Sequence, residues 1–247
     1  MDEAATLRMA QLARERRGQG KDVLDLTVGE PDFDTPLFIK EAAKAALDQG
    51  FTKYTPVPGL TDLRQAICRK LKRDNGLDYA PENIVVSTGA KQSITNTCLA
   101  LLNPGDEVIL LSPYWVSYLG MVRLAGATPV FVEAGVDRDF KVTPDQLRQA
   151  ISSRTRLIIF NTPCNPTGSV YSAGEQKSLA EEIVRHEGVY VISDEIYEYI
   201  TFETPHVSLA TMSGMWERTT TPRTSAASSL RTWTSTRTTP RRLRRRR

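Results

Sequence analysis

The stretch Val189-Tyr190-Val191-Ile192-Ser193-Asp194-Glu195-Ile196-Tyr197 joins a short apolar run to a pair of carboxylates. A continuous apolar segment of this length predicts a strand that is buried on both faces. Such a strand brings Asp194 to its carboxyl end, where burial of the charge is costly unless a cationic partner meets it. We therefore expect a positive group beside Asp194, with Tyr197 facing the same ligand. Capping of a following helix by Asp194 is the alternative.

The same rhythm of strand, turn and helix extends upstream to residue 81. Strands are expected at 84–88, 108–111, 128–132, 156–160 and 189–193, and helices at 91–102, 115–125, 144–151 and 175–186. Apolar strands separated by helices predict an α/β fold with a mostly parallel sheet covered by helices on both faces.

The first 80 residues are expected to be mainly helical. Helices are predicted within 2–17, from Pro36 to Gly50 and from Leu63 to Asn75, and a short strand at 23–28. Asp34 or Thr35 can cap the second helix, with Pro36 in its first position.

The bulk composition is that of a globular protein. The 247 residues are 40% apolar, and no apolar run approaches the ~20 residues needed to cross a bilayer. The N-terminus lacks the apolar core of a signal peptide, so a cytoplasmic location is expected. Three scattered cysteines and two histidines predict neither a disulfide framework nor a metal site.

The net charge of +3 conceals an uneven distribution. From Arg218 onward the sequence contains ten arginines and no acidic residue. Without these arginines, 22 basic and 29 acidic residues remain, which gives a net charge of −7. The basic excess therefore belongs to the tail alone.

Ligands of parallel sheets collect outside the carboxyl ends of the strands, so the junctions after each strand are candidate sites. After 84–88, Gly89-Ala90-Lys91 places small residues at a helix start, where free N–H groups form a cradle for an anion. A lysine in the first helical turn opposes the helix dipole, and a bound phosphate relieves that conflict. A tight turn with a solvated Lys91 explains the same residues.

Two further junctions carry side chains suited to a ligand. Trp115 follows the strand 108–111, and an aromatic ring there can stack on a planar cofactor or pack a helix onto the sheet. Asn165 lies in a stiff loop with two prolines after the strand 156–160, and the loop presents its amide to the crevice.

Five motifs, in this order and spacing, resemble the class I (fold-type I) pyridoxal-phosphate-dependent aminotransferases, especially the aspartate aminotransferase branch. They are Gly29-Glu30-Pro31-Asp32-Phe33-Asp34-Thr35-Pro36, Lys53-Tyr54-Thr55-Pro56, Ser112-Pro113-Tyr114-Trp115-Val116-Ser117-Tyr118, Asn165-Pro166-Thr167-Gly168 and Ser193-Asp194-Glu195-Ile196-Tyr197. The resemblance covers about residues 5 to 215. It departs at Cys164, where asparagine is usual in the family, and no histidine is recognisably paired with this thiol for a nucleophilic role.

The resemblance implies pyridoxal 5′-phosphate as the cofactor. Gly89, Ala90 and Lys91 are expected to bind its phosphate, mainly through backbone N–H groups. Asp194 is expected to keep the ring nitrogen protonated, so that the ring accepts electrons during transfer of the amino group.

The remaining cofactor and substrate contacts also come from the resemblance. Trp115 is expected to stack on the ring, and Asn165 and Tyr197 to hydrogen-bond its phenolic oxygen. Tyr54 is expected to reach the phosphate of the partner subunit in a homodimer, and Gly29 to lie against the substrate carboxylate. Trp115 and Asn165 are expected to contact the substrate as well.

The family's Schiff-base lysine is missing from its expected place. The last lysine is Lys177, which precedes Asp194, and no arginine can replace a lysine as general acid and base. No catalytic residue is therefore assigned, and the chain is expected to be inactive. The parent activity is expected to transfer an amino group between an amino acid, aspartate or aromatic, and a 2-oxo acid. The alternatives are another pyridoxal-phosphate reaction such as a β-lyase, or a catalytically silent binding protein.

Three segments are predicted along the chain. Residues 1–40 form an N-terminal arm and small-domain segment, and residues 41–217 form an incomplete large cofactor-binding domain. Residues 218–247 have the composition of a disordered basic tail. We interpret this tail as an out-of-frame reading, which requires a serine-lysine motif in another frame of the nucleotides. A nucleic-acid-binding arm at Arg241 to Arg247 is the competing interpretation.

Overall fold

The computed structural model describes residues 5–24, 29, 32–203 and 205–222. These residues form two compact units, which divide between Pro56 and Val57. The domain boundary at residue 40 remains a prediction, and the division between the two compact units falls after it in the sequence.

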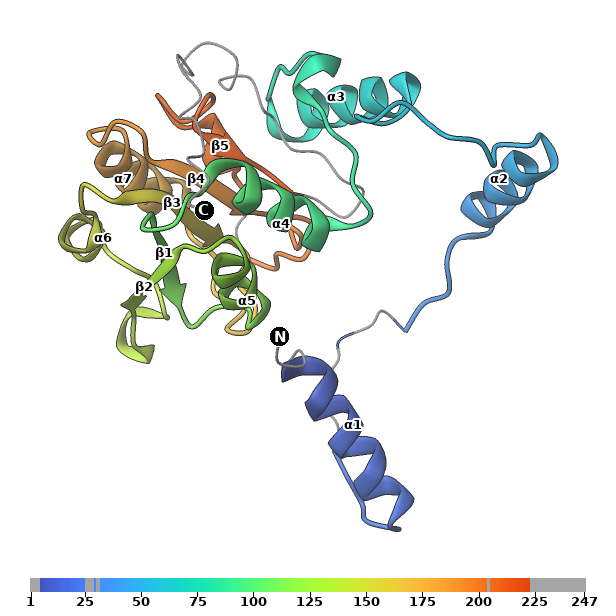
Figure 1. Ribbon diagram of the computed structural model, residues 1–247, viewed down its shortest axis with the longest axis horizontal. Helices are drawn as coiled ribbons and strands as arrows, with labels where there is room; N and C mark the ends of the chain where they lie inside the picture. The colour runs from blue at the N-terminus through green and yellow to red at the C-terminus, as the bar shows by residue number, and fades with distance from the viewer. Residues whose placement is uncertain (1–4, 25–28, 30–31, 204, 223–247) are drawn as a thin grey trace, which may run out of the picture. The chain divides into compact units, whose positions relative to one another are not determined.

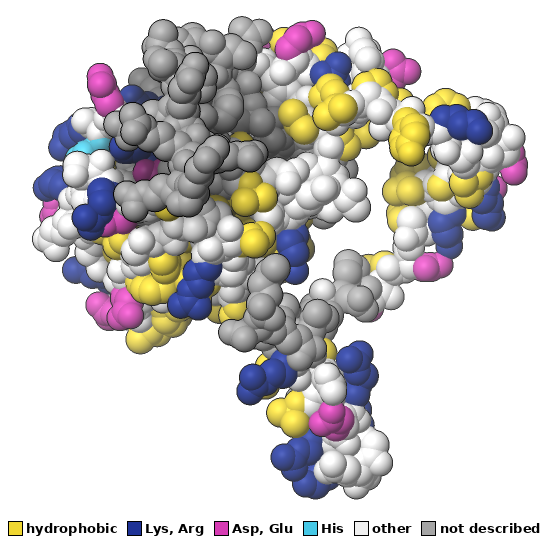
Figure 2. All heavy atoms as spheres, in the orientation of Figure 1, with side chains coloured by type: hydrophobic (Ala, Val, Ile, Leu, Met, Phe, Trp, Pro, Cys, Tyr) yellow, Lys and Arg dark blue, Asp and Glu magenta, His cyan; other side chains and the backbone are white. Residues whose placement is uncertain are grey.

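The first unit holds two helices, α1 (Ala5–Gly18) and α2 (Leu37–Asp48). Pro36 itself is the N-cap residue of α2 and no side chain caps the helix. The predicted cap by Asp34 or Thr35 is therefore wrong, and Asp34 instead accepts a hydrogen bond from Lys40 at 2.7 Å. Although α2 is amphipathic, it buries none of its residues, and apolar side chains are exposed over it (Figure 2).

The second unit is built around a five-stranded parallel sheet (Figure 1). Its strands are β1 (Glu107–Ser112), β2 (Thr128–Glu133), β3 (Thr155–Asn161), β4 (Tyr190–Asp194) and β5 (Thr219–Thr220), in the order β2-β1-β3-β4-β5. Its helices are α3 (Thr61–Asn75), α4 (Ala90–Leu101), α5 (Ser117–Leu124), α6 (Pro144–Ala150) and α7 (Ala173–Ile183). The predicted parallel sheet with helices on both faces is confirmed.

The two faces of the sheet form separate cores because successive side chains of a strand point to opposite sides. Ile109, Ile158 and Val191 pack with side chains of α6 and α7. Val108, Leu157 and Ile192 pack with side chains of α4 and α5 on the other face (Figure 1). At the usual 25 cal/mol per Å², each buried Ile or Leu contributes about 1.5–3 kcal/mol to folding.

Two predicted elements differ from the structure. Residues 84–88 are extended but form only an isolated bridge at Val85, because a strand requires a continuous ladder partner and the described residues provide none there. Thr219 and Thr220, which the sequence analysis assigned to the tail, instead pair with Val191 and Ile192 and are buried. Parallel pairing uses the backbone, and β-branched threonine suits a strand. The rest of the predicted tail, residues 223–247, lies outside the described residues.

None of the described helices is long and apolar enough to cross a bilayer.

Candidate functional site

The carboxyl ends of β1, β3 and β4 bring several predicted residues together. Parallel pairing sets Asn161, the last residue of β3, beside Asp194, the last residue of β4. The loops that carry Trp115, Asn165 and Tyr197 start from these same strand ends. The predicted convergence of residues after the strands therefore follows from the register of the sheet.

Asp194 is buried, with 4% of its surface exposed. Its Oδ2 accepts a hydrogen bond from the Tyr118 hydroxyl at 2.6 Å, and its Oδ1 accepts one from the backbone N–H of Ile196 at 3.3 Å. Among the described residues, no lysine, arginine or histidine forms an ion pair with it. The site thus contains a buried carboxylate without a described cationic neighbour.

Burial raises the pKa of Asp194, and the negative charge of Glu195 adds to this effect. The hydrogen bonds from Tyr118 and Ile196 oppose it because they favour the charged carboxylate. Burial and the Asp194 charge together hold the pKa of Tyr118 well above its ordinary value, so this hydroxyl remains a donor.

A continuous path of contacts joins Asp194 to Trp115 and Lys91. The rings of Tyr118 and Trp115 meet edge to face with centroids 5.5 Å apart. The Lys91 ammonium lies 4.9 Å from the centroid of the Trp115 ring, which is a cation–π distance. Three predicted residues from three different junctions therefore belong to one cluster, with Tyr118 as the link between them.

A second path joins Asp194 to Asn165 and Tyr197. The Asn161 amide donates to the Asp194 backbone carbonyl at 2.8 Å and accepts from the Asn165 N–H, also at 2.8 Å. The Asn165 amide then donates to the Tyr197 hydroxyl at 3.4 Å. Asn161 fixes the direction of the Asn165 loop, because its oxygen and its nitrogen both have partners.

The Gly89 turn precedes α4 and lies next to Lys91 in the sequence. Gly89 has φ +84° and ψ 160°, a conformation that only glycine adopts readily, and no side chain caps the helix. A Cβ at this position would meet nothing within 4 Å, so the space in front of the turn is open. An uncapped helix start beside a lysine attracts an anion.

Tyr118 and Asn161 are not among the predicted site residues, although both contact Asp194. Tyr118 lies three residues after Trp115, a spacing that puts both on one side of a helical turn. Asn161 ends the strand that pairs with the strand of Asp194. These positions could have been recognised once the pairing of the two strands was assumed.

The remaining residues of interest are Cys164, Tyr54 and Gly29. Cys164 donates to the Pro113 carbonyl at 3.6 Å and links two of the loops. Tyr54 has a fully exposed side chain, and Gly29 also lies in the first unit. A cavity of about 350 Å³, lined by residues that include Arg156, Arg185 and His186, lies at the amino ends of β3 and β4, opposite the cluster.

The residues present fit a phosphorylated, positively charged aromatic ring. The uncapped start of α4 with Lys91 suits a phosphate, and the Trp115 ring offers a stacking surface. The buried Asp194 carboxylate suits a protonated ring nitrogen, because such a group supplies the positive charge that burial demands.

Comparison with known proteins agrees with this chemistry. Residues 21–224 match the family model for class I and II aminotransferases. The chain is 52% identical over 198 residues to the aspartate/prephenate aminotransferase of Cereibacter sphaeroides. The aligned region covers 80% of this chain and 50% of that protein. It is 48% identical over 211 residues to the aspartate aminotransferase of Geobacillus stearothermophilus, covering 85% of this chain and 53% of that protein.

The fold is similar to that of solved aminotransferases. The aspartate aminotransferase of Thermus thermophilus with maleate superposes with a TM-score of 0.86 at 46% identity, covering 92% of this chain and 58% of that one. The chain thus spans about half the length of the curated relatives it matches.

Proposed function

This chain belongs to the class I and II aminotransferases, a pyridoxal-phosphate-dependent family, and on that premise we propose that residues 57–222 bind the cofactor at the Asp194 cluster. The parent activity that we propose is transfer of an amino group from an amino acid to a 2-oxo acid. When bound, the cofactor supplies an electron-accepting ring that stabilises negative charge on the carbon bearing the amino group.

One observation carries the proposal. The Asp194 carboxylate is buried at the end of β4, is held by the Tyr118 hydroxyl, and has no ion-pair partner among the described residues. A buried carboxylate in this state is stabilised by a ligand that brings a positive charge. The protonated nitrogen of the pyridine ring is that charge, and Asp194 keeps the proton on it.

The phosphate end of the site is assigned to the start of α4. The N–H groups of Ala90 and Lys91 donate to the phosphate, and Gly89 lets the backbone approach it closely. The Lys91 ammonium adds a positive charge next to the Trp115 ring. Trp115 stacks on the pyridine ring, and Asn165 and Tyr197 hold the phenolic oxygen with the hydrogen-bonding groups that now meet at 3.4 Å.

The substrate proposal rests on the relatives. Relatives that are about half identical over the aligned residues are named aspartate or aspartate/prephenate aminotransferases, which supports aspartate as the amino donor. We assign Gly29, Trp115 and Asn165 to the substrate, and Tyr54 to the phosphate of the partner subunit in a homodimer. The fold by itself does not fix the substrate, because one scaffold hosts many reactions.

Turnover is a separate matter from binding. No lysine follows Lys177 in the sequence, and Lys177 lies on the exposed side of α7, 4.0 Å from Glu181. We propose that the 247-residue chain binds the cofactor without carrying the reaction through, since no described lysine stands where protons must move between the reacting carbons.

Calorimetric titration with pyridoxamine 5′-phosphate tests the binding proposal. This amino form of the cofactor needs no covalent bond to a lysine, so it isolates the non-covalent site. The chain is expected to bind it, and to bind pyridoxamine without the phosphate at least about tenfold more weakly, a difference of about 1.4 kcal/mol.

Two lysine variants serve as a matched pair. Lys91→Ala is expected to weaken binding of pyridoxamine 5′-phosphate, whereas Lys177→Ala on the surface of α7 is expected to leave it unchanged. No saturable binding, or equal affinity with and without the phosphate, would refute the proposed function.

A further inference from the structure

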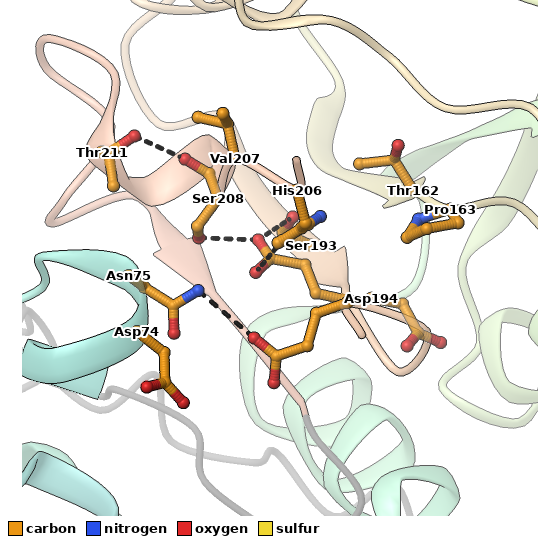
Figure 3. Close-up of polar contacts among 12 residues, drawn as sticks. Asp74, Asn75, Thr162, Pro163, Ser193, Asp194, His206, Val207, Ser208 and Thr211 are labelled. Carbon is orange, nitrogen blue, oxygen red and sulfur yellow. Dashed lines mark hydrogen bonds and ion pairs between the residues drawn. The ribbon is translucent and has the colours of Figure 1, made fainter. Parts of the chain in front are cut away.

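Two buried acids follow each other at the end of β4 and diverge to opposite sides. Asp194 shares the face of Ile192 and meets Tyr118 of α5. Glu195 shares the face of Val191 and Ser193 and meets the segment that leads into the short helix η3 (Leu209–Thr211). Figure 3 shows Asp194 turned away from Ser208 and His206. The alternation of a strand explains the divergence.

Glu195 is the more buried of the two acids, with none of its surface exposed. Its Oε1 accepts hydrogen bonds from the Ser193 hydroxyl at 2.8 Å and the Ser208 hydroxyl at 2.7 Å. Its Oε2 lies 3.0 Å from Nε2 of His206, whose side chain is 5% exposed (Figure 3). A carboxylate placed this deeply needs such partners, and these three fix its position.

His206 contacts Glu195 through Nε2, whereas its Nδ1 is buried and has no hydrogen-bond partner among the described residues.

These hydrogen bonds connect the two ends of one segment of the chain to each other. Glu195 stands at its start, and His206 and Ser208 stand at its end, 11 and 13 residues later. The segment carries Tyr197, whose hydroxyl meets Asn165, and Glu198, which accepts from Lys70 at 2.5 Å. Glu198 also accepts from Asn75 at 3.2 Å, and Figure 3 shows the bond from Asn75 as a dashed line. The residue before it in the chain is Asp194.

We propose that Glu195 is a positioning residue that holds Asp194 and Tyr197 in the orientation in which they meet the cofactor. The inference rests on the proposed function, because it explains how that site keeps its shape. Without the Glu195 carboxylate, the 195–208 segment loses its internal fastening, and the peptide between Asp194 and Glu195 is free to rotate. Asp194 then loses its alignment with the ring nitrogen, and Tyr197 loses its alignment with the phenolic oxygen.

The test compares two buried glutamates in the same chain, each of which contacts a histidine. Glu195→Ala removes the fastening at the site. Glu182→Ala, on α7, removes the corresponding contact with His186, and the Glu182 side chain, 3% exposed, also pairs with Arg148 and Arg185. Both substitutions are expected to lower stability, whereas only Glu195→Ala is expected to affect the site.

Two measurements distinguish positioning from a merely structural role. Amide hydrogen exchange of residues 196–200 is expected to become faster in Glu195→Ala than in Glu182→Ala. The affinity for pyridoxamine 5′-phosphate is expected to fall about tenfold, since the loss of buried hydrogen bonds typically costs this much or more. The absorption band of the bound ring, which reports protonation of its nitrogen, is expected to shift toward the neutral form.

The conservative variant and a milder one complete the series. Glu195→Gln keeps an oxygen for both serine hydroxyls and is expected to retain affinity within about threefold. If Glu195→Ala does not fold, Ser208→Ala removes one donor and is expected to change exchange and affinity in the same direction by a smaller amount.

Unchanged exchange and affinity in a folded Glu195→Ala would overturn the inference. Faster exchange with wild-type affinity and an unshifted ring band would also overturn it, because the role would then be structural only. If the wild-type chain fails to bind pyridoxamine 5′-phosphate, the proposed function itself is refuted, and the exchange rates alone decide whether Glu195 holds the segment.

Discussion

At the scale of single residues, the burial of the Asp194 carboxyl group makes the stability of the folded protein depend on pH. The unfolded chain ionises this carboxyl group near pH ~3.9, whereas burial raises its pKa in the folded protein. Between these two values the folded state binds the proton more tightly than the unfolded state. The free energy of unfolding therefore falls as the pH rises through this interval. Above the interval, the stabilisation that came from the tighter proton binding of the folded state is fully lost.

Asp194→Asn is expected to make the ligand-free protein more stable at pH 7 than the wild type. The amide carries no charge to bury, and its N–H can donate to the Tyr118 hydroxyl. The difference is expected to shrink as the pH falls through the raised pKa of Asp194, because the wild-type carboxyl group then becomes protonated as well. Urea denaturation at several pH values measures it, and a less stable variant at pH 7 would contradict the argument. The same variant is expected to lose at least about tenfold in affinity for pyridoxamine 5′-phosphate, about 1.4 kcal/mol, by titration.

Tyr118→Phe tests the hydrogen bond to the charged form of Asp194. Its removal is expected to cost about 1.5–3 kcal/mol, the usual range for a bond to a charged group, once Asp194 is ionised. The cost is expected to be smaller at low pH. Denaturation at pH 4.5 and pH 8 measures both values.

Tyr171→Phe is the matched control for Tyr118→Phe. The Tyr171 hydroxyl is also buried, but it accepts from the neutral N–H of Val142 at 2.7 Å. Its loss is expected to cost about the same at both pH values. A Tyr118 cost that did not depend on pH would show that Asp194 remains protonated across the range.

At the scale of elements, the helices differ in how they begin. α6 and α7 start with capping boxes, Thr143 with Gln146 and Ser172 with Glu175. α4 starts at Gly89 without a side-chain cap. The caps of α6 and α7 each satisfy one N–H group of the first turn, whereas the first turn of α4 has no side-chain cap.

Ser172→Ala is expected to lower the free energy of unfolding by about 1 kcal/mol, because it removes the acceptor of the Glu175 N–H. Ser178→Ala on the same helix is the control. The Ser178 hydroxyl only donates back to the Gly174 carbonyl, and alanine is the better helix former, so this change is expected to be neutral or slightly stabilising. Equal effects in thermal or chemical denaturation would exclude the capping explanation.

At the scale of the whole molecule, the proposed cofactor site around Asp194 lies in a sequence with no lysine after Lys177. Incubation with pyridoxal 5′-phosphate and then borohydride is expected to leave the mass of the intact chain unchanged, and no visible band of a lysine adduct is expected. Lys91, the lysine nearest the cluster, is expected to bind phosphate rather than the aldehyde. A mass increase that disappears in Lys91→Arg would contradict both expectations.

Much of the fold and of the site could be predicted from local sequence. The apolar runs of β1, β3 and β4, the left-handed Gly76 that ends α3, and the small residues at Gly89 act within a few positions of themselves. Residues 84–88 show the limit of such reasoning. They have the composition of a strand, yet a strand exists only through its partner, and local sequence does not specify that partner.

The sequence by itself therefore determined the alternation of strands and helices, the family resemblance and the residues that end each strand. The tertiary structure alone decided that Tyr118 hydrogen-bonds to Asp194, which lies 76 residues later in the sequence. It also decided that His206 and Ser208 contact the Glu195 carboxylate. The physical reason is that turn and helix preferences depend on neighbours along the chain. Buried hydrogen bonds between distant residues depend on sheet register and on which face each side chain takes, and both are set only when the sheet assembles.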